Sequence, residues 1–558
     1  MIRPSPVASG AFLALLLLAA PADGQGLSGR RPAGATRPAT EISRPANVHY
    51  VNAAATGAND GSRWADAFLS LQSALAAAQA GEEIWVAAGT YTPSDFDETA
   101  SFVLKSGVAL YGGFAGGEIA REQRDWDANP TLLSGDIGRD DIVGSGSTWY
   151  LGWNITTANS GHVVVGSGTD ASAILDGFSI ENGNTGPPGT PAGDPLMYGG
   201  GLYNVAGHPT VKNCTFRHNL AAFAHGAAIY NLDSSPSITA CRFLENYVHL
   251  GDGGGIFDAG TSAPVIADCV FARNLCVAGT AAGASGGGLS HESSVPLTVS
   301  RCTFDENWCR PFFPVGDEVG YGGGLSNSFS PLTVVDCTFT RNEAQYGGGL
   351  MTWGPTTVVD CLFTDNRAVP HPNDPYPELG GTGAGLMISS FAVETLQVLD
   401  CTIAYNHGKK YTGLFGGWNS TLVVANSILW GNDATSPEVL GTWRAELAGA
   451  FDASYCCIAL IFDPPGPGED PIDPADLPGC IDLDPRFVLG APGGDLRLAA
   501  GSPCIDAGDN LALPPTLATD LDGHPRRVDD PATPDTGRGT VPIVDMGAFE
   551  HASAGAPR

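Results

Sequence analysis

The chain has 558 residues, and its 59 acidic side chains outnumber its 27 lysines and arginines to give a formal net charge of −32. This charge argues against a nucleic-acid partner, because phosphate backbones are bound by basic patches, and against electrostatic docking on anionic membranes. Charged residues make up 15% of the sequence and glycine occurs 75 times, in a length that suits one large or two ordinary domains.

The first 22 residues have the pattern of a secretory signal peptide. Arg3 supplies the positive start, residues 8–20 form an apolar run too short to span a bilayer comfortably, and residues 20–22 offer a small-residue cleavage site. Residues 23–46 have low complexity, and we expect them to be disordered. We therefore expect an exported protein, extracellular or at the cell surface with outer-membrane association left open, and no transmembrane helix once the signal is removed.

Residues 50–93 predict a strand, a helix and a second strand in turn. Asp66 is a good N-cap residue, and Gly81 suits the end of the helix because glycine readily adopts the backbone conformation found there. The apolar stripe of this helix consists of Phe68, Leu71, Leu75 and Ala78. A helix at this point would cover the open end of a stacked architecture that follows it.

A short motif recurs in the middle of the chain, and it reads Cys-x-Phe-x-x-Asn in six of its seven copies, with Ile403 replacing Phe in the seventh. A β-branched run precedes each copy, and a Gly-rich tetrapeptide ending in Leu or Ile follows it. Successive cysteines are 24 to 40 residues apart. The cysteines are Cys214, Cys241, Cys269, Cys302, Cys337, Cys361 and Cys401. The asparagines are Asn219, Asn246, Asn274, Asn307, Asn342, Asn366 and Asn406.

Each repeat is long enough for three short strands and three corners. No hairpin signal joins strands within a repeat, so we expect each strand to pair in parallel with its counterpart in the next repeat. The handedness rule for parallel crossovers makes such a stack right-handed. The fold class we predict is all-β, a right-handed parallel β-helix of three-strand coils with a short N-terminal capping helix.

The fold gives each repeated residue a physical role. Cys and the Phe two positions later share one strand face, so both should point into the core, with the cysteines as packed thiols. The Asn lies at a corner, where its side-chain amide can bond to the Asn above and below. The structural ladder we predict therefore has a column of cysteines and a column of asparagines.

The pairing of a G-[GA]-[GA]-[IL] tetrapeptide with F-x-x-N resembles the repeats of right-handed parallel β-helix proteins of the pectate-lyase-like superfamily and of chlamydial polymorphic outer-membrane proteins. The segments "DLRLAAGSPCIDAGD" (495–509) and "DLDGHPRR…VDMGAFE" (520–550) resemble the choice-of-anchor Q domain. The resemblance implies a β-helix with its cap over residues 47–440, an anchor-like region over 441–551 and a tail over 552–558. No sorting signal follows these segments, so we expect any anchoring to use another route.

The six remaining cysteines are candidates for disulfides. Stacked cysteines of the column point the same way, so their sulfurs meet poorly. Cys276 and Cys309 each follow a repeat cysteine by seven residues and fall in neighbouring loops, where a disulfide and two free thiols are both open. One or two bridges are expected among the four cysteines outside the repeat, which are Cys456, Cys457, Cys480 and Cys504.

The position before the repeat cysteine is acidic in several coils. Asp268, Arg301, Asp336, Asp360 and Asp400 occupy it in five consecutive copies. Carboxylates stacked at this spacing repel one another. Either they splay into water beside Arg301, or Asp336, Asp360 and Asp400 bind Ca²⁺ through oxygen ligands. No other cofactor is required.

Two further groups of residues are candidates for function. Weak catalytic candidates lie in two adjacent coils, at turn positions that vary as solvated positions do, and they are Arg217, His218, Glu245 and Asp252. Long insertions at 308–321 and 367–382 flank a short gap at 343–346, which predicts a groove unless the loops fold onto themselves. The ligand groove would be formed by Trp308, Phe312, Phe313, Gln345, Tyr346, His371, Asp374 and Tyr376.

These features predict an exported, non-catalytic and monomeric surface β-helix, adhesin-like or structural, which binds a polysaccharide, a surface glycan or a protein partner. The alternative is a polysaccharide lyase or a glycoside hydrolase that acts on an extracellular polysaccharide.

Overall fold

The computed structural model describes residues 47–141, 158–185, 191, 193–278, 283–311, 319–370, 380–390, 392–417, 419–435, 446–459 and 476–551. All of them belong to one compact unit, Arg44–Arg558. The expected signal peptide, the lead-in and the tail lie outside the described residues. No helix within the described ranges is long and apolar enough to cross a membrane.

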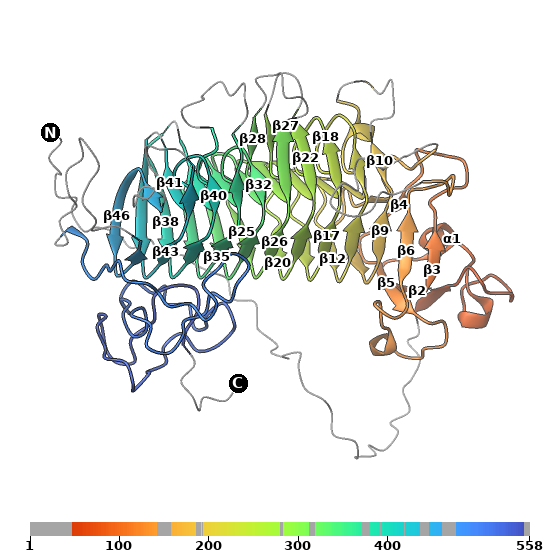
Figure 1. The fold of residues 1–558 in the computed structure, drawn as a ribbon. Coiled ribbons are helices and arrows are strands. Elements are labelled where there is room, and N and C mark those ends of the chain that lie inside the picture. Colours follow the sequence, from red (N-terminus) through yellow and green to blue (C-terminus); the bar gives the residue numbers. More distant parts are fainter. Residues whose placement is uncertain are drawn as a thin grey trace, which may run out of the picture. The chain divides into compact units, whose positions relative to one another are not determined.

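Four long sheets run along the stack of coils shown in Figure 1, and all pairs of named strands are parallel. Sheet A has 13 strands, sheet B 12, sheet C 11 and sheet D 9. One coil contains β11 (Leu202–Val205) of sheet C, β12 (Thr210–Lys212) of sheet A, β13 (Thr215–Arg217) of sheet B and β14 (Leu220–Ala221) of sheet D. The coils therefore have four strands rather than three, because a short strand follows each repeat asparagine.

The remaining strands follow the same order. Sheet A also contains β1 (Val48–Val51), β2 (Glu83–Ala87), β5 (Ala109–Phe114), β8 (Ile174–Asp176), β16 (Ser237–Thr239), β20 (Val265–Ala267), β25 (Leu297–Ser300), β30 (Leu332–Val335), β34 (Thr356–Val359), β38 (Glu394–Leu399), β42 (Ser420–Ala425) and β46 (Ala450–Ser454). Sheet B also contains β3 (Gly89–Tyr91), β6 (Thr131–Ser134), β9 (Ser179–Glu181), β17 (Arg242–Leu244), β21 (Val270–Ala272), β26 (Thr303–Asp305), β31 (Thr338–Thr340), β35 (Leu362–Thr364), β39 (Thr402–Ala404), β43 (Ile428–Trp430) and β47 (Cys457–Ile458).

Sheet C also contains β4 (Phe102–Val103), β7 (Val164–Val165), β15 (Ile229–Leu232), β19 (Ile256–Gly260), β24 (Leu289–Ser293), β29 (Leu325–Asn327), β33 (Leu350–Thr352), β37 (Leu386–Ile388), β41 (Leu414–Gly416) and β45 (Leu447–Ala448). Sheet D also contains β10 (Asn184–Thr185), β18 (Tyr247–His249), β22 (Leu275–Ala278), β27 (Trp308–Pro311), β32 (Glu343–Ala344), β36 (Arg367–Ala368), β40 (His407–Gly408) and β44 (Asp433–Ala434). A separate pair is formed by β23 (Ala284–Ser285) and β28 (Gly320–Tyr321).

Two left-handed corners turn the chain between the sheets. The seven residues that precede the repeat cysteines have φ values of 50–57°, and they turn the chain from sheet A to sheet B. The seven residues that precede the repeat asparagines have φ values of 53–58°, and they turn it from sheet B to sheet D. Isolated left-handed residues disfavour β-branched side chains, which none of these positions carries.

The core contains a ladder of phenylalanines from Phe216 to Phe363. Neighbouring ring centroids are 4.6–5.3 Å apart and the rings are nearly parallel. Ile403 pairs in register with Phe363. The rings are fully buried, so each coil adds a large apolar side chain to one continuous core.

The asparagine column is fully buried and forms a ladder of hydrogen bonds. Each Nδ2 donates to Oδ1 of the next asparagine at 2.9–3.0 Å, from Asn219 to Asn406. The same Nδ2 also donates to a main-chain carbonyl of the preceding coil at 2.8–3.0 Å, as Asn342 does to Phe304. An amide is suited to this buried position because it both donates and accepts.

The cysteine column is also buried. Each thiol donates to the carbonyl two residues earlier, at 3.1–3.3 Å. Ser427 continues the column, since its Oγ accepts from the main-chain N–H of Cys401 at 3.1 Å. Cys456 comes next and makes the same thiol contact, to Ser454 at 3.2 Å. Placing Cys456 outside the repeat was therefore wrong, and the coils continue past residue 440 to β47.

The N-terminal helix α1 spans Leu71–Ala77 and begins after Ser70, whose Oγ accepts from the N–H of Ser73. The prediction that Asp66 caps it was wrong. Asp66 ends the short helix η1 (Trp64–Asp66), and its carboxylate accepts from the N–H of Ala58. Phe68 then forms a bridge with Val51, which keeps the chain extended until Ser70. The apolar side of α1 packs against the core at the N-terminal end of the coils.

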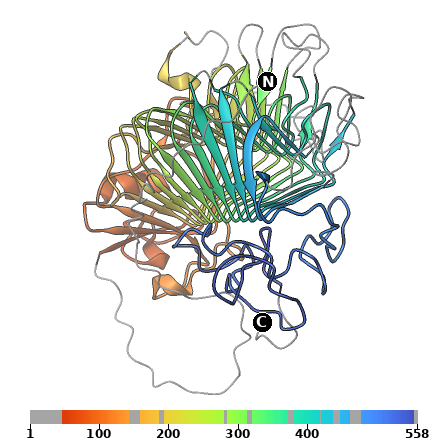
Figure 2. The same cartoon turned by 90° about the vertical axis from the view of Figure 1, so that its left-hand side faces the viewer.

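Two other short helices are η2 (Arg121–Gln123) and η4 (Pro195–Met197). Residues 476–551, the C-terminal segment, contain no named strand or helix. Figure 2 shows this segment in dark blue along one side of the coils. It packs an apolar cluster that includes Cys504, Met546 and Phe549 against Ala404 and Ile428 of the coils.

Candidate functional site

The described part of the predicted ligand groove is packed rather than open. Trp308, Gln345 and Tyr346 are 9%, 2% and 4% exposed. Tyr346 belongs to an apolar cluster with Met351 that covers the outer face of sheet C. The other five groove residues, Phe312, Phe313, His371, Asp374 and Tyr376, lie outside the described residues. The loops therefore fold onto the coils where the structure describes them.

The weak catalytic candidates do not converge on one site. Glu245 is held by His218 at 2.9 Å and by Arg273 at 2.7 Å. The hydrogen bond from His218 is the main cause that lowers the pKa of Glu245 to about 2. Arg217 pairs instead with Glu181. A carboxylate with so low a pKa cannot serve as a general acid near neutral pH.

Asp252 forms a separate contact, in which its Oδ2 lies 2.9 Å from Nδ1 of His225. Its other oxygen accepts from the N–H of Ser285 at 2.7 Å. Asp252 thus stabilises the chain where it passes between two coils, separately from the pair formed by Glu245 and His218.

The residues before the column cysteines form a corner strip, which we define as Asp336, Asp360, Asp400 and Asn426. The expectation that its carboxylates splay into water is wrong for Asp360 and Asp400, which are fully buried by the C-terminal segment. The expectation holds for Asp268, whose exposed carboxylate forms a bidentate ion pair with Arg301 at 2.7 and 2.8 Å. The difference arises because only the later coils lie under the C-terminal segment.

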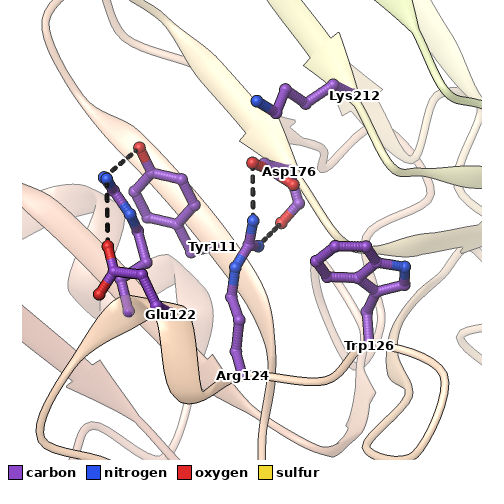
Figure 3. A pocket seen from close by; sticks show the side chains of 7 residues that line it. Tyr111, Glu122, Arg124, Trp126, Asp176 and Lys212 are labelled. Atoms are coloured by element: carbon purple, nitrogen blue, oxygen red, sulfur yellow. Dashed lines mark hydrogen bonds and ion pairs between the residues drawn. The ribbon is translucent and has the colours of Figure 1, made fainter. Parts of the chain in front are cut away.

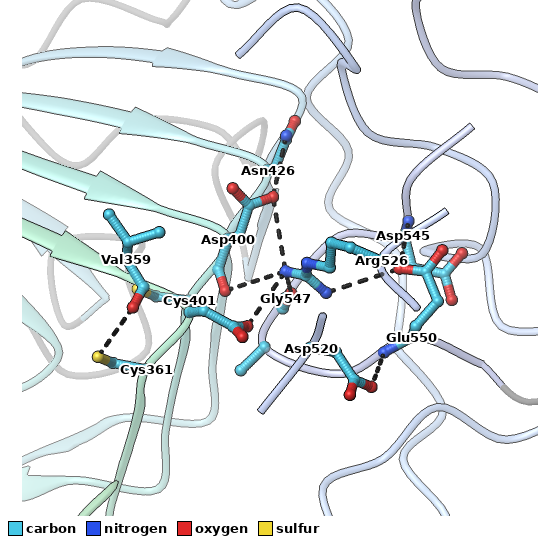
Figure 4. A network of polar contacts seen from close by, with 12 residues as sticks. Val359, Cys361, Asp400, Cys401, Asn426, Asp520, Arg526, Asp545, Gly547 and Glu550 are labelled. Carbon is cyan, nitrogen blue, oxygen red and sulfur yellow. Dashed lines mark hydrogen bonds and ion pairs between the residues drawn. The ribbon is translucent and has the colours of Figure 1, made fainter. Parts of the chain in front are cut away.

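Arg526 of the C-terminal segment supplies the cation for the buried part of the strip (Figure 4). Its Nη2 lies 3.5 Å from Oδ1 of both Asp360 and Asp400, and its Nη1 lies 3.6 Å from Glu550. The guanidinium is 1% exposed. In the described part of the chain, the carboxylate oxygens of Asp336, Asp360 and Asp400 do not all lie within 4.8 Å of one another. The calcium expectation at these aspartates stays untested.

Burial changes the protonation of this network. Burial raises the pKa of Asp360 to about 10 and that of Asp400 to about 6, and the positive charge of Arg526 opposes both shifts. Burial also raises the pKa of Glu550. At neutral pH we therefore expect Asp360 to hold a proton, so that the Asp400 carboxylate balances Arg526.

Asn426 also fixes the C-terminal segment. Its Nδ2 donates to Oδ1 of Asp400 at 3.1 Å and to the carbonyl of Asp509 at 3.1 Å, and its Oδ1 accepts from the N–H of Asp509 at 2.7 Å. Its own carbonyl accepts from Gly547 at 2.7 Å. The strip is thus a docking surface within the chain.

The exposed end of the strip opens into a groove of about 560 Å³, which we call the Asp336 groove. Its floor is the outer face of β26, β31 and β35, with Thr303 and Thr338, and its wall is formed by the C-terminal segment. Oδ1 of Asp336 is buried, and the Asp336 carboxylate is hydrogen-bonded to the neighbouring carboxyl of Asp360. Burial raises the pKa of Asp336 to about 6.

The far wall of the Asp336 groove consists of paired charges. Arg497 donates to both oxygens of Asp522 at 2.6 and 2.9 Å and to Asp495 at 3.0 Å. Its guanidinium lies over the ring of Phe549, 5.4 Å from the centroid. The groove therefore presents hydroxyls, carboxylate oxygens and a planar cation side by side.

A second cavity, the N-terminal hollow, has a volume of about 430 Å³ (Figure 3). Arg124 forms one wall, since its Nη2 lies 2.8 Å from Asp176 and its guanidinium lies 5.0 Å from the ring centroids of both Tyr111 and Trp126. Lys212 also lines the hollow and has no ion-pair partner within the described residues. Trp126 is 37% exposed.

The disulfide candidates are all thiols in the structure. Cys276 and Cys309 stack in register, and their sulfurs are 2.8 Å apart. Cys480 accepts from the N–H of Cys456 at 3.4 Å. The Cys457 thiol has a raised pKa, and its contact with Cys504 is the main cause.

The model of the right handed beta helix region family matches residues 154–444, which is more than half of the chain. The chain belongs to this family, and the predicted right-handed parallel β-helix is confirmed. No curated protein gave a significant match.

Among solved structures, the pectate lyase Pel9A is 13% identical with a TM-score of 0.42, covering 92% of this chain and 98% of its own. XylC in complex with xylose is 11% identical with a TM-score of 0.41, covering 91% and 98%. A rhamnogalacturonan lyase is 11% identical with a TM-score of 0.23, covering 68% and 73%.

Proposed function

We propose that the protein is an exported, non-catalytic β-helix that binds a neutral glycan in the Asp336 groove. The observation that carries the proposal is the lining of the groove, where the partly buried carboxylate of Asp336 lies beside the hydroxyls of Thr303 and Thr338. Sugar hydroxyls both donate and accept hydrogen bonds, so they match this lining.

The composition of the groove also supports a glycan. Sugars offer many hydroxyls, which both donate and accept, and weakly apolar C–H faces. Thr303 and Thr338 offer hydroxyls, and the Arg497–Asp522 pair offers planar donors and acceptors. Leu362, Leu521 and Phe549 add apolar surface at the same groove. Cavities that bind small polar ligands combine these two kinds of lining.

The charge of the protein favours a neutral ligand at this place. The chain carries a net charge of −32, and the groove itself is lined by Asp336, Asp495, Asp520 and Asp522 against Arg301 and Arg497. A polyanion would be repelled by this surplus of carboxylate. Carboxylates accept hydrogen bonds from uncharged hydroxyls without that penalty.

Binding and catalysis are separated by one experiment with matched variants. The mature chain is screened against neutral and acidic polysaccharides, and the supernatant is assayed for new reducing ends and unsaturated products. Thr338→Val and Asp336→Asn change the groove, whereas Thr215→Val makes the same change at the equivalent position of sheet B outside it. We expect the two groove variants to lower glycan affinity about tenfold or more, which corresponds to about 1.4 kcal/mol, and Thr215→Val to leave it unchanged.

The proposal fails if the groove variants bind as the wild type does. Release of oligosaccharides by the wild type would replace it with the lyase or hydrolase alternative. The resemblance of residues 495–550 to the choice-of-anchor Q domain stays a prediction, and attachment to a cell surface is part of the proposal. Fractionation of cells that express the full chain tests export.

A second candidate ligand is an acidic sugar bound in the N-terminal hollow. The unpaired ammonium of Lys212 is a partner for a carboxylate or sulfate, and the exposed ring of Trp126 offers a face for a sugar ring. Lys212→Gln should abolish binding of an acidic polysaccharide and leave neutral glycans unaffected. Arg242→Gln, an exposed cation elsewhere on the coils, is the matched control. Equal loss in both variants would mean that only overall charge matters.

A further inference from the structure

Three carboxylates meet on the C-terminal segment, away from the two cavities. They belong to Asp506, Asp529 and Asp535, and each offers an oxygen such that the three oxygens lie within 4.8 Å of one another. Asp529 and Asp535 are exposed, whereas Asp506 is fully buried. Exposed acidic groups are common on a protein with this charge, and the buried Asp506 is what distinguishes this cluster.

The side chain of Asp506 has an unused oxygen. Its Oδ2 accepts from the N–H of Asp530 at 3.2 Å. Its Oδ1 is buried and has no hydrogen-bond partner within the described residues. Because nearly all buried polar atoms in proteins are paired, a buried carboxylate oxygen that faces two other carboxylates indicates a missing positive ligand.

The main chain fixes the loop around Asp506 in place. The carbonyl of Asp506 accepts from the N–H groups of Thr536 at 2.9 Å and Gly537 at 3.1 Å. Within the loop, the carboxylate of Asp530 accepts from Ala532 at 3.3 Å and from the hydroxyl of Thr533 at 2.9 Å. The loop therefore holds the two exposed carboxylates beside Asp506 without using them itself.

Two other groups of three possible metal ligands lie equally close together in the described chain, but their central carboxylates are already hydrogen-bonded. In the group of Asp520, Asp522 and His524, Asp520 accepts from three N–H groups and Asp522 is paired with Arg497. In the group of Asp136, Asp140 and Asp141, both oxygens of Asp136 accept from the main chain of the other two. The central carboxylates of those two groups, Asp520 and Asp136, thus already accept hydrogen bonds from the main chain on both oxygens.

We propose that Asp506, Asp529 and Asp535 bind a calcium ion. The three ligands are oxygens, which favours a hard cation over zinc or copper. Two of the carboxylates are exposed and can adjust their distances, which suits the variable geometry of Ca²⁺ better than the strict octahedron of Mg²⁺. A site with few protein ligands should bind in the range of extracellular modules, with a Kd of about 10⁻⁴–10⁻³ M.

The electrostatics of the cluster agree with this assignment. Burial, together with the charges of Asp529, Asp535 and Asp530, raises the pKa of Asp506 to about 6, although the hydrogen bond from the N–H of Asp530 opposes the shift. A bound divalent cation would relieve this repulsion.

The ion would also strengthen the attachment of the C-terminal segment. The N–H of Asp506 donates to Oδ1 of Asp545 at 2.7 Å. The other carboxylate oxygen of Asp545 accepts from His551, and its N–H points to Glu550, the partner of Arg526. The loop of residues 529–535 is thus linked through Asp506 to the network that holds the segment on the coils.

The test uses the full mature chain, stripped with a chelator, and calcium chloride as the only added ligand. Calorimetric titration gives the affinity, and thermal unfolding gives the shift in midpoint at matched ionic strength. Asp529→Asn and Asp535→Asn remove exposed ligands and should leave the fold intact. Asp482→Asn, which removes another carboxylate of the same segment outside all three groups, is the matched control.

We expect the wild type and Asp482→Asn to bind one calcium ion and to unfold at a higher temperature in its presence. At ten times Kd, the folding equilibrium constant should rise about tenfold. Each of the two cluster variants should weaken calcium binding about tenfold or more. The proposal is overturned if the wild type shows no calcium-dependent heat or shift, or if both cluster variants retain the wild-type affinity.

Discussion

The guanidinium of Arg526 lies 3.5 Å from the carboxylate of Asp400, although 126 residues separate the two along the chain. Asp400 lies at a corner of the β-helix, and Arg526 belongs to the C-terminal segment that covers this corner. Both side chains are almost completely buried. One buried cation thus joins a corner of the β-helix to the C-terminal segment, which does not contain the repeat.

Replacing Arg526 should be strongly destabilising. Arg526→Met leaves Asp400 buried without a cation, and breaking a buried pair in this way costs about 3–5 kcal/mol. Arg526→Lys should restore little, because a single ammonium cannot reach Asp360, Asp400 and Glu550 in the manner of a planar guanidinium. Urea denaturation of the two variants and the wild type measures the effect.

A matched control is Arg301→Met, which removes an exposed pair with Asp268. Exposed pairs contribute about 0–1 kcal/mol. If the two Met variants lose the same stability, the buried network does not stabilise attachment of the C-terminal segment.

The stability of the protein should fall as the pH rises from 5 to 8. Folding raises the pKa of Asp400 to about 6, of Asp545 to about 7 and of Asp360 to about 10, mainly through burial. Over this range the folded state holds protons that the unfolded state has released. Each such proton lowers the free energy of unfolding by about 1.4 kcal/mol per pH unit.

Denaturant midpoints at pH 5, 6, 7 and 8 measure this slope. Asp360→Asn keeps the neutral shape without a titrating group, so its slope should be shallower than that of the wild type. A midpoint that rises with pH would contradict the assignment. Below pH 4 the trend should reverse, because the pKa of Glu245 is lowered to about 2 and its stabilisation is lost in acid.

The asparagine ladder should be intolerant of side chains that cannot donate. Asn342 donates from Nδ2 to Phe304 at 2.9 Å and to Asn366 at 3.0 Å. Asn342→Asp removes both side-chain donors and buries a carboxylate, and Asn342→Ala removes the partner of the Phe304 carbonyl and that of the N–H of Asn307. Each unpaired buried group costs about 1–3 kcal/mol, so we expect a loss of several kcal/mol by chemical denaturation. Asn213→Ala, a half-buried corner asparagine outside the ladder, should cost much less.

Cys276 and Cys309 should form a disulfide under mild oxidation, because their sulfurs are already 2.8 Å apart although the two residues stack in register. The seven column cysteines should remain thiols, since each donates to the carbonyl two residues earlier. Intact mass without reduction should show a loss of about 2 Da per bridge, and peptide mapping should assign it to this pair. A bridge between Cys337 and Cys361 would contradict the packed-thiol column.

The repeating part of the fold was predictable residue by residue. Phe339, Cys337 and Asn342 could be placed because the same spacing recurs in every coil, and parallel stacking in register repeats whatever the local sequence encodes. The fourth strand was missed because it is only two to four residues long and its sequence varies. Cys456 was missed because Ser427 interrupts the column, although the degenerate copy "NSILWGN" that starts at Asn426 could have indicated it.

The candidate site was predicted less well. The acidic column was recognised in the sequence, but the burial of Asp360 and Asp400 was not, since nothing in a repeat reveals which coils another segment covers. Arg526 belongs to a recognisable motif, yet no periodicity relates it to a corner of the coils. The predicted groove stays a prediction where its walls lie outside the described residues, but Gln345 and Tyr346, its predicted floor, are buried, because loop length does not determine whether a loop folds onto its own sheet.

The amino-acid sequence by itself determined the coils, their parallel register and the inward columns of Phe, Cys and Asn, because these depend on contacts between neighbouring copies of one pattern. Only the tertiary structure decided which of the equivalent corner residues are solvated, like Asp268, and which are buried beneath Arg526, like Asp400. The reason is that a solenoid presents the same corner many times, while the C-terminal segment can cover it only once.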